Sequence, residues 1–328
     1  MAKNVKNYLI TGFSGFVSRY FVEYLNQTRE KANILGIDII KPSFNFNCRN
    51  NNYTKFLKVN LLNKNKIKDI ILKFQPDFIL HLASFSSVAF SWQKPILSFN
   101  NNTNIFLNLL EAVRETGIKC RILSVGSSEE YGIVKNNDLP LSESNRLNPI
   151  SPYAVARVSQ ELLSKIYVDG YGLNIIMTRS FNHIGPGQKE MFVVSSFAKQ
   201  MVKIKKESRN KGVLRVGNLK IVRDFLDVRD VVKAYYLLLQ KGKCGEIYNI
   251  CAGRGIPLKE IINCIAGYLK IKVKLKVDQT LIRPNDNPVI IGNNKKIRAE
   301  LGWQPEIPLK KSIADICNYW EQNSQDMK

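Results

Sequence analysis

Residues 11–18 of this chain read Thr11-Gly12-Phe13-Ser14-Gly15-Phe16-Val17-Ser18, a glycine-containing segment that indicates the fold. It follows an apolar run, Tyr8–Ile10, that is typical of a buried strand, and it leads into a helical pattern over Val17–Asn26. A glycine-rich turn between a first strand and a first helix is the context of a dinucleotide-binding fingerprint. We expect Gly12 to allow the tight turn and Gly15 to let the backbone approach a pyrophosphate at the helix N-terminus.

Two residues beyond the glycines bear on this turn. Ser18 occupies the position of the usual third glycine, and the small extra volume of a serine is not expected to abolish binding. Asp38 lies at the end of the second predicted strand, 23 residues after Gly15, where a carboxylate can bond both ribose hydroxyls. A carboxylate there repels a 2′-phosphate, so the sequence favours NAD(H) and leaves NADP(H) possible. The alternative interpretations are an ordinary strand-to-helix turn at residues 11–18 and a solvated aspartate at position 38.

The rest of the chain predicts an α/β fold, a Rossmann-type doubly wound parallel sheet with a smaller α/β C-terminal substrate domain. Short apolar runs indicate strands at Tyr8–Ile10, Ile34–Ile40, Phe56–Val59, Phe78–Leu80, Ile122–Val125 and Ile175–Met177. Helical patterns lie at Val17–Asn26, Ile67–Phe74, Asn102–Thr116, Tyr153–Tyr171, Val193–Lys206, Val231–Gln240, Leu258–Leu269 and Lys295–Leu301. We expect residues 1–182 to form the NAD-binding domain, with a segment near 220–250 returning to its sheet at Glu246–Ile250. Residues 183–328 would mainly bind substrate.

The composition and charge of the chain limit the classes of function that it can have. The formal net charge is +22, but the basic residues are spread along the chain without a nucleic-acid-binding motif. We therefore expect a polyanionic small substrate, with nucleic acid as the minor alternative. No run of about 18 apolar residues predicts a membrane span, and no signal peptide precedes the first strand, so a cytoplasmic protein is expected. Six scattered cysteines and two histidines predict neither disulfides nor a metal site.

A second group of residues predicts redox chemistry. Ser127 follows the fifth predicted strand, at the end where α/β sheets bind ligands. Tyr153 opens a predicted helix, and Arg157 lies one turn further along the same helical face. A tyrosine, with an unperturbed pKa of about 10, is a poor acid or base at neutral pH unless a fixed cation stabilises its phenolate. Ser127 would hydrogen-bond the substrate oxygen that exchanges the proton.

These motifs resemble the extended short-chain dehydrogenase/reductase family over nearly the whole chain. The matches are T-G-x-x-G-F at residues 11–16, His81–Ala83, and the Tyr-x-x-x-Lys dyad at 153–157, where this chain has Arg157. Arginine keeps the charge but is longer, forked and always protonated. The sequence is most similar to the GDP-sugar branch, in particular to GDP-6-deoxy-D-mannose reductases, and is related to GDP-mannose 4,6-dehydratases. The similar stretches are residues 126–132, 178–188, 216–225, 281–284 and 301–305.

The resemblance implies roles for individual residues. Catalysis would fall to Ser127, Tyr153, Arg157 and Glu129. The cofactor would be bound by Gly12, Ser14, Gly15, Phe16, Val17, Asp38, Asn60, Leu61, Leu82, Ala83, Asn102, Tyr153 and Arg157. The GDP-sugar would be bound by Ser86, Ser128, Asn182, His183, Gly217, Asn218, Arg223, Arg283 and Asp286. For Arg223 an ion pair with Asp224 or Asp227 is the alternative, and for His183 a hydrogen-bonded place in the core.

The implied reaction is NAD(P)H-dependent reduction of the C4 keto group of a GDP-4-keto-6-deoxyhexose, of the GDP-rhamnose type, or of a related GDP-heptose. A 4,6-dehydratase in which Glu129 removes the C5 proton, with tightly bound NAD, is the first alternative. A C4 dehydrogenase and a catalytically weak nucleotide-binding homologue are the others. The resemblance also implies a homodimer through the helices at 102–116 and 153–171, although Asn100, Asn101, Asn102 and Asn104 make the first of them less apolar than expected.

Overall fold

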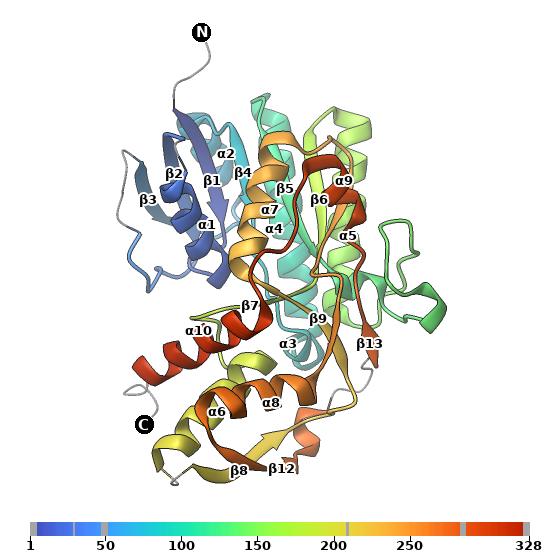
Figure 1. The fold of residues 1–328 in the computed structure, drawn as a ribbon. Helices are drawn as coiled ribbons and strands as arrows, with labels where there is room; N and C mark the ends of the chain where they lie inside the picture. Colours follow the sequence, from blue (N-terminus) through green and yellow to red (C-terminus); the bar gives the residue numbers. More distant parts are fainter. Residues whose placement is uncertain (1–4, 29, 47–51, 208–209, 283–286, 324–328) are drawn as a thin grey trace.

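The computed structural model describes residues 5–28, 30–46, 52–207, 210–282 and 287–323. Its main feature is a parallel sheet of seven strands in the order β10-β6-β5-β4-β1-β2-β3, with helices on both sides (Figure 1). The strands are β1 (Lys6–Thr11), β2 (Ala32–Asp38), β3 (Tyr53–Lys58), β4 (Phe78–His81), β5 (Arg121–Ser127), β6 (Asn174–Ser180) and β10 (Ile247–Ile250). The predicted Rossmann-type sheet is therefore confirmed.

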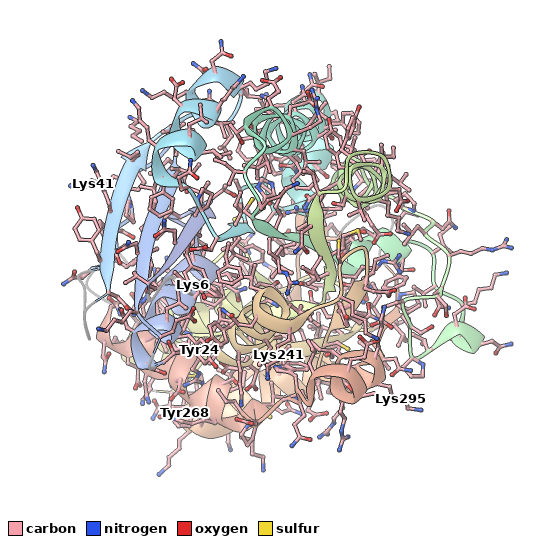
Figure 2. All side chains as sticks on the ribbon, turned by 90° about the horizontal axis from the view of Figure 1, so that it is seen from above. Lys6, Tyr24, Lys41, Lys241, Tyr268 and Lys295 are labelled. Carbon is pink, nitrogen blue, oxygen red and sulfur yellow. The ribbon has the colours of Figure 1, made fainter. Side chains whose placement is uncertain are left out.

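Helices lie on both faces of this sheet when it is seen from above (Figure 2), and an apolar layer packs on each face. One layer packs α1 (Phe16–Gln27), α7 (Val228–Lys241) and α9 (Lys295–Leu301) against the sheet. The other contains α2 (Lys64–Phe74), α4 (Pro95–Thr116) and α5 (Pro152–Tyr171). Strands such as β4 are buried along their whole length because both of their faces are covered.

The second half of the chain contributes to both parts of the molecule. β10 pairs with β6 in parallel, from Ile247 beside Met177 to Ile250 beside Ser180, in the segment expected to return to the sheet. The lower part in Figure 1 has its own apolar core, formed mainly by three helices and by strands of two small sheets. Its elements are β7 (Asn182–Ile184), α6 (Val193–Glu207), β8 (Lys211–Val216), β9 (Val222–Asp227), β11 (Gly255–Pro257), α8 (Leu258–Leu269), β12 (Lys272–Val277), β13 (Val289–Ile290) and α10 (Leu309–Gln322). The domain division at residue 182 stays a prediction.

The predicted elements differ from the structure mainly at their ends. The helix expected from Asn102 begins at Pro95, because a proline at the first helical position fits the helix and the pattern before Asn102 is irregular. The helices α3 (Val88–Gln93) and α10 were not predicted. Three 3₁₀ turns complete the fold, η1 (Ser128–Tyr131), η2 (Asn136–Asp138) and η3 (Gln279–Leu281). No helix in the described ranges is long and apolar enough to cross a bilayer.

Candidate active site

The ends of β1, β2 and β4 meet at the predicted dinucleotide turn. Gly12 adopts a φ of 68°, and a Cβ there would lie 2.7 Å from the backbone nitrogen of Ala83 after β4. The Ser14 backbone N–H donates to the Asp38 carboxylate at the end of β2 over 2.9 Å. Between β1 and β4 the strand order reverses, and the crevice at such a point is where doubly wound sheets bind ligands. Glycine is thus required at position 12 for two reasons: the positive φ, and the close approach of the Ala83 backbone.

The N-terminus of α1 suits an anion. Its N-cap is Gly15, no side chain caps it, and no acidic residue lies in its first turn, so backbone N–H groups and the helix dipole face the crevice. Ser18, at the place of the third glycine, is fully buried and donates to the Phe13 carbonyl over 2.7 Å. The serine therefore closes the turn through its own hydrogen bond. Phe16 packs its ring edge-on against Tyr20, and Val17 packs against the adjacent core.

The loop after β4 is tied to the turn and to α4. The Leu82 N–H donates to the Thr11 carbonyl over 3.2 Å, and the Ala83 N–H donates to the Thr11 hydroxyl. Asn102 is buried and bonds both backbone groups of Phe85, over 2.7 and 3.2 Å. Asn102 therefore fixes the loop next to the predicted cofactor. His81 lies inside the sheet, where burial lowers its pKa to about 3.

The adenine end of the predicted cofactor site lies beyond β3. The Val59 N–H donates to the Asp38 carbonyl over 2.8 Å, which brings Asn60 next to the end of β2. Asn60 is exposed and its side-chain oxygen accepts from the Leu62 N–H over 2.9 Å. Leu61 is 5% exposed and packs with α2. The ends of β2 and β3 and the glycine turn thus lie next to one another, and the roles of Asp38 and Asn60 toward a cofactor stay predictions.

The predicted dyad is formed on α5. Arg157 donates from Nε to the Tyr153 hydroxyl over 3.2 Å, and its guanidinium carbon lies 5.3 Å from the centre of the Tyr153 ring. The two side chains are only 6% and 5% exposed, so the cation acts on the phenol in a largely dry environment. Arg157 also donates to the Val125 carbonyl, two residues before Ser127, which holds the start of α5 against the end of β5.

Ser127 is the last residue of β5 and caps η1. Its hydroxyl accepts from the Glu129 N–H over 3.2 Å, and its own N–H donates to the Glu130 carboxylate over 2.6 Å. Ser128 is 5% exposed, whereas Glu129 is partly exposed. Glu130 is fully buried, and burial raises its pKa to about 8. Glu129 is therefore the acidic residue of this turn that can reach a ligand.

The predicted hexose-binding residues come from two places. Ser86 is exposed in the loop after β4. Asn182 and His183 lie on β7, which pairs with β9, and Asn182 donates to the Asp224 carbonyl over 3.3 Å. His183 Nε2 lies 3.3 Å from the Tyr235 hydroxyl, and burial lowers the pKa of the imidazole to about 4. A neutral His183 held by one hydrogen bond suits either a polar contact or a core position.

The predicted nucleotide-binding residues lie around β9. A Cβ on Gly217 would come within 2.8 Å of the Leu281 carbonyl, so this position requires glycine in any case. Asn218 accepts from the Lys220 N–H over 3.0 Å and thereby shapes the turn before β9. Arg223 is 8% exposed and donates to the carbonyls of Val222 and Asn287. Two further predicted residues, Arg283 and Asp286, lie outside the described residues.

Three residues that support the site were not predicted. Gln160 and Ser84 accept hydrogen bonds from the Arg157 guanidinium. Asp224 accepts from the backbone of Ala252, Gly253 and Gly292 and so joins three segments behind β9. The spacing of Gln160, three residues after Arg157 on one helix, could have indicated their contact. The contacts of Ser84 and Asp224 join residues far apart in the sequence, so no local pattern predicts them.

Comparison with known proteins shows to which family this chain belongs. The family model described as GDP-mannose 4,6 dehydratase matches residues 9–316. The chain belongs to this family. The members of this GDP-mannose 4,6-dehydratase family are extended short-chain dehydrogenases/reductases, so the resemblance found in the sequence is confirmed.

Relatives within and around the family differ in their reactions. The chain is 30% identical over 317 residues to a GDP-6-deoxy-D-mannose reductase of Pseudomonas aeruginosa, covering 97% of this chain and 98% of that protein. It is 28% identical to GDP-mannose 4,6 dehydratase 2 of Arabidopsis thaliana, over 93% and 84% of the two chains. Two of the reaction types weighed from the sequence, the reductase and the dehydratase, therefore occur among its relatives.

Solved structures agree with the fold. The structure of RMD from Pseudomonas aeruginosa complexed with NADPH has a TM-score of 0.84 at 30% identity, covering 97% of this chain and 99% of the other. A UDP-glucose 4-epimerase from Thermotoga maritima, solved with UDP-glucose, has a TM-score of 0.86 at 26% identity with the same coverage.

Proposed function

We propose that this protein is a nicotinamide-dependent reductase of the C4 keto group of a GDP-4-keto-6-deoxyhexose, of the GDP-6-deoxy-D-mannose or GDP-rhamnose type, or of a related GDP-heptose. The observation that carries the proposal is the contact of Arg157 with the Tyr153 hydroxyl, made by a guanidinium that also bonds the Val125 carbonyl on β5. It occurs in a chain that is similar over 97% of its length to a GDP-6-deoxy-D-mannose reductase.

The residues present fit a dinucleotide. The Gly12–Gly15 turn and the uncapped start of α1 suit a pyrophosphate, and Asp38 lies where it can bond a ribose. A bound dihydronicotinamide would supply the hydride. We propose NADH as the preferred form, because the Asp38 carboxylate would repel the 2′-phosphate of NADPH. The NADPH in the similar Pseudomonas structure makes this preference worth a direct test.

Proton transfer falls to residues of this chain. As the hydride adds to C4, the Tyr153 hydroxyl would give its proton to the oxygen, leaving a C4 alcohol and a phenolate that solvent reprotonates. The Arg157 cation would stabilise that phenolate, since it already donates to the same oxygen. Ser127 would donate from its hydroxyl to the substrate oxygen and orient the carbonyl. Arg223, Asn182 and the Gly217–Asn218 turn would bind the GDP group.

One observation favours a 4,6-dehydratase as the second candidate. Glu129 directly follows Ser128 in η1 and, unlike the buried Glu130, is partly exposed, so it could remove a proton from C5. The family model carries the dehydratase name, and dehydratases are among the relatives. The hydride of C4 would first pass to bound NAD, Glu129 would then remove the C5 proton as the C6 hydroxyl leaves as water, and the hydride would return to C6.

The test offers the purified protein GDP-4-keto-6-deoxymannose with NADH, then with NADPH, and separately GDP-mannose alone. Oxidation of NADH with formation of the C4 alcohol supports the reductase. A keto product from GDP-mannose without added cofactor would assign the dehydratase instead. If every keto sugar offered with either cofactor is left unchanged, the reductase proposal is wrong.

We also propose a homodimer formed by α4 and α5. The outward face of α5 carries Val155, Leu162 and Ile166, which are 41%, 50% and 57% exposed. On α4, Ile96 is 76% exposed and Asn102 turns inward to Phe85, while Asn100 and Asn104 are exposed. Exposed large apolar side chains on two neighbouring helices support an interaction surface at this place.

A further inference from the structure

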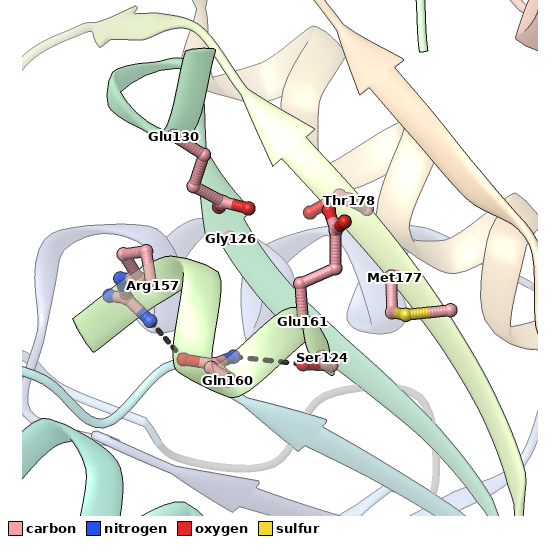
Figure 3. A pocket seen from close by; sticks show the side chains of 8 residues that line it. All are labelled: Ser124, Gly126, Glu130, Arg157, Gln160, Glu161, Met177 and Thr178. Atoms are coloured by element: carbon pink, nitrogen blue, oxygen red, sulfur yellow. Dashed lines mark hydrogen bonds between the residues drawn. The ribbon is translucent and has the colours of Figure 1, made fainter. Parts of the chain in front are cut away.

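The dyad arginine is held by a set of neutral groups between α5 and β5. Its NH1 donates to Gln160 Oε1 over 2.6 Å and to the Val125 carbonyl over 2.9 Å, and its NH2 donates to the Ser84 hydroxyl. Figure 3 shows Arg157, Gln160 and Ser124 joined in sequence by hydrogen bonds. With these groups in place, Nε is the guanidinium donor that faces Tyr153.

The orientation of the Gln160 amide is fixed from both ends. Its Nε2 donates to the Ser124 hydroxyl over 2.8 Å and to the Val125 carbonyl over 3.1 Å. Ser164 adds a hydrogen bond to the same Ser124 oxygen over 3.2 Å. Since guanidinium nitrogens only donate, the amide oxygen must face Arg157, and a flipped amide would set donor against donor. Gln160 is 1% exposed, so water does not replace it easily.

A buried acidic residue, Glu130, interacts with the arginine electrostatically but accepts its hydrogen bond from the Ser127 N–H. Among the described residues Arg157 forms no ion pair, because Glu161 is bound by Arg179 through two hydrogen bonds of 2.8 and 2.9 Å. Glu130 accepts from the Ser127 N–H, and burial raises its pKa. The titratable and charged groups around this cluster are His81 on β4, Glu130 on η1, Glu161 and Lys165 on α5, Arg179 on β6 and Tyr235 on α7.

We propose that Gln160 is a positioning residue of the site: it holds the Arg157 guanidinium with Nε toward the Tyr153 oxygen, and its neutral amide leaves the full cationic charge to stabilise the phenolate. A carboxylate at this position would hold the guanidinium equally well but would cancel its charge. A lysine at position 157 presents one compact ammonium in place of a fork, so it cannot bond Gln160 and Tyr153 in this geometry. Gln160 is thus matched to the arginine. The role assigned to Tyr153 rests on the proposed function.

The experiment compares Gln160→Glu and Gln160→Leu with the unchanged protein, each also made in an Arg157→Lys background. In the reductase assay, Gln160→Leu should lower kcat about tenfold with less than a twofold change in KM for the sugar, because orientation is lost without a substrate contact. Gln160→Glu should move the alkaline limb of the kcat–pH profile up by about one pH unit, since the phenolate loses its cation. In the Arg157→Lys background Gln160→Leu should change kcat less than twofold. Gln200→Glu on α6, remote from the dyad, is the control.

A second readout separates this proposal from the reductase proposal. The phenolate absorbance of the unchanged protein minus that of Tyr153→Phe, followed against pH without sugar, reports Tyr153 whether or not any keto sugar is reduced. Gln160→Glu should raise the midpoint of this difference titration by about one pH unit. If Gln160→Glu does not fold, Gln160→Leu in the same titration decides, with an upward shift expected because the guanidinium is no longer fixed. The proposal would be overturned if the Gln160 variants only lower the melting temperature. In that case the midpoint of the difference titration would not move, and the effects of Gln160→Leu and Arg157→Lys on kcat would be additive, as for a purely structural role.

Discussion

Arg157 Nε and the Tyr153 hydroxyl lie 3.2 Å apart, one turn of α5 from each other, and both side chains are buried. A permanently charged guanidinium thus takes the place of the ammonium that the family dyad has. Because a buried cation interacts strongly with a developing phenolate, this geometry is compatible with proton transfer at neutral pH. The serine at position 18 is accommodated in a comparable way, since it closes the turn with its own hydrogen bond.

Tyr153→Phe should remove the proton donor while keeping the ring. We expect kcat for NADH-dependent keto reduction to fall by about 10²–10⁴-fold, the usual loss when a general acid is removed. The Kd for NADH, measured by cofactor fluorescence, should change only a few-fold. Tyr171→Phe, on the same helix and 55% exposed, is the matched control and should keep its activity. A Tyr153→Phe variant with nearly full activity would remove Tyr153 from the mechanism.

Asp38→Asn should relax the choice of cofactor. The amide oxygen can still accept from the Ser14 N–H, but the negative charge next to the ribose is lost. We expect the ratio of kcat/KM with NADPH to that with NADH to rise about tenfold, as like-charge repulsion disappears. Asp69→Asn, exposed on α2, should leave the ratio unchanged. A wild-type protein that already prefers NADPH would contradict the assignment of Asp38.

The sequence predicted the nucleotide turn and the dyad because both are local patterns. Gly12, Gly15 and the start of α1 lie within one turn, and Tyr153 and Arg157 are four residues apart on one helix face. Asp38 could be placed because strand ends in a parallel sheet meet at one edge. The contacts of Arg157 with Ser84 and of Asp224 with Gly292 could not be predicted, since they join segments that meet only in the folded chain. The helix α10 was missed although its buried residues Ile313, Ile316 and Cys317 follow a helical spacing, so a local signal was present there too.

Leu162→Glu combined with Ile166→Glu should convert the proposed dimer into a monomer. Both residues lie on the exposed face of α5, and burying four carboxylates across a twofold interface would cost more than the contact provides. Size-exclusion chromatography with light scattering measures the mass of each form. Val277→Glu, a 54% exposed position on β12, should leave the mass unchanged. An unmodified protein that runs as a monomer would overturn the dimer proposal.

Glu130→Gln should change how stability depends on pH. In the folded protein burial raises the pKa of Glu130 from 4.5 to about 8, so the native state binds a proton that the unfolded chain releases. The free energy of unfolding therefore contains a contribution that is complete below about pH 4.5 and is lost as the pH rises through about 8.

Glutamine keeps the oxygen that accepts from the Ser127 N–H and carries no titratable proton. The variant should thus gain stability relative to the unchanged protein as the pH is raised from 5 to 8, by a few kcal/mol at most. Urea unfolding at both pH values measures this difference. Glu190→Gln is the control, because its side chain is 58% exposed. Parallel stability curves for Glu130→Gln and the unchanged protein would show that Glu130 is ionised in the fold, and its buried carboxylate would then need Arg157 or Arg179 as its counter-charge.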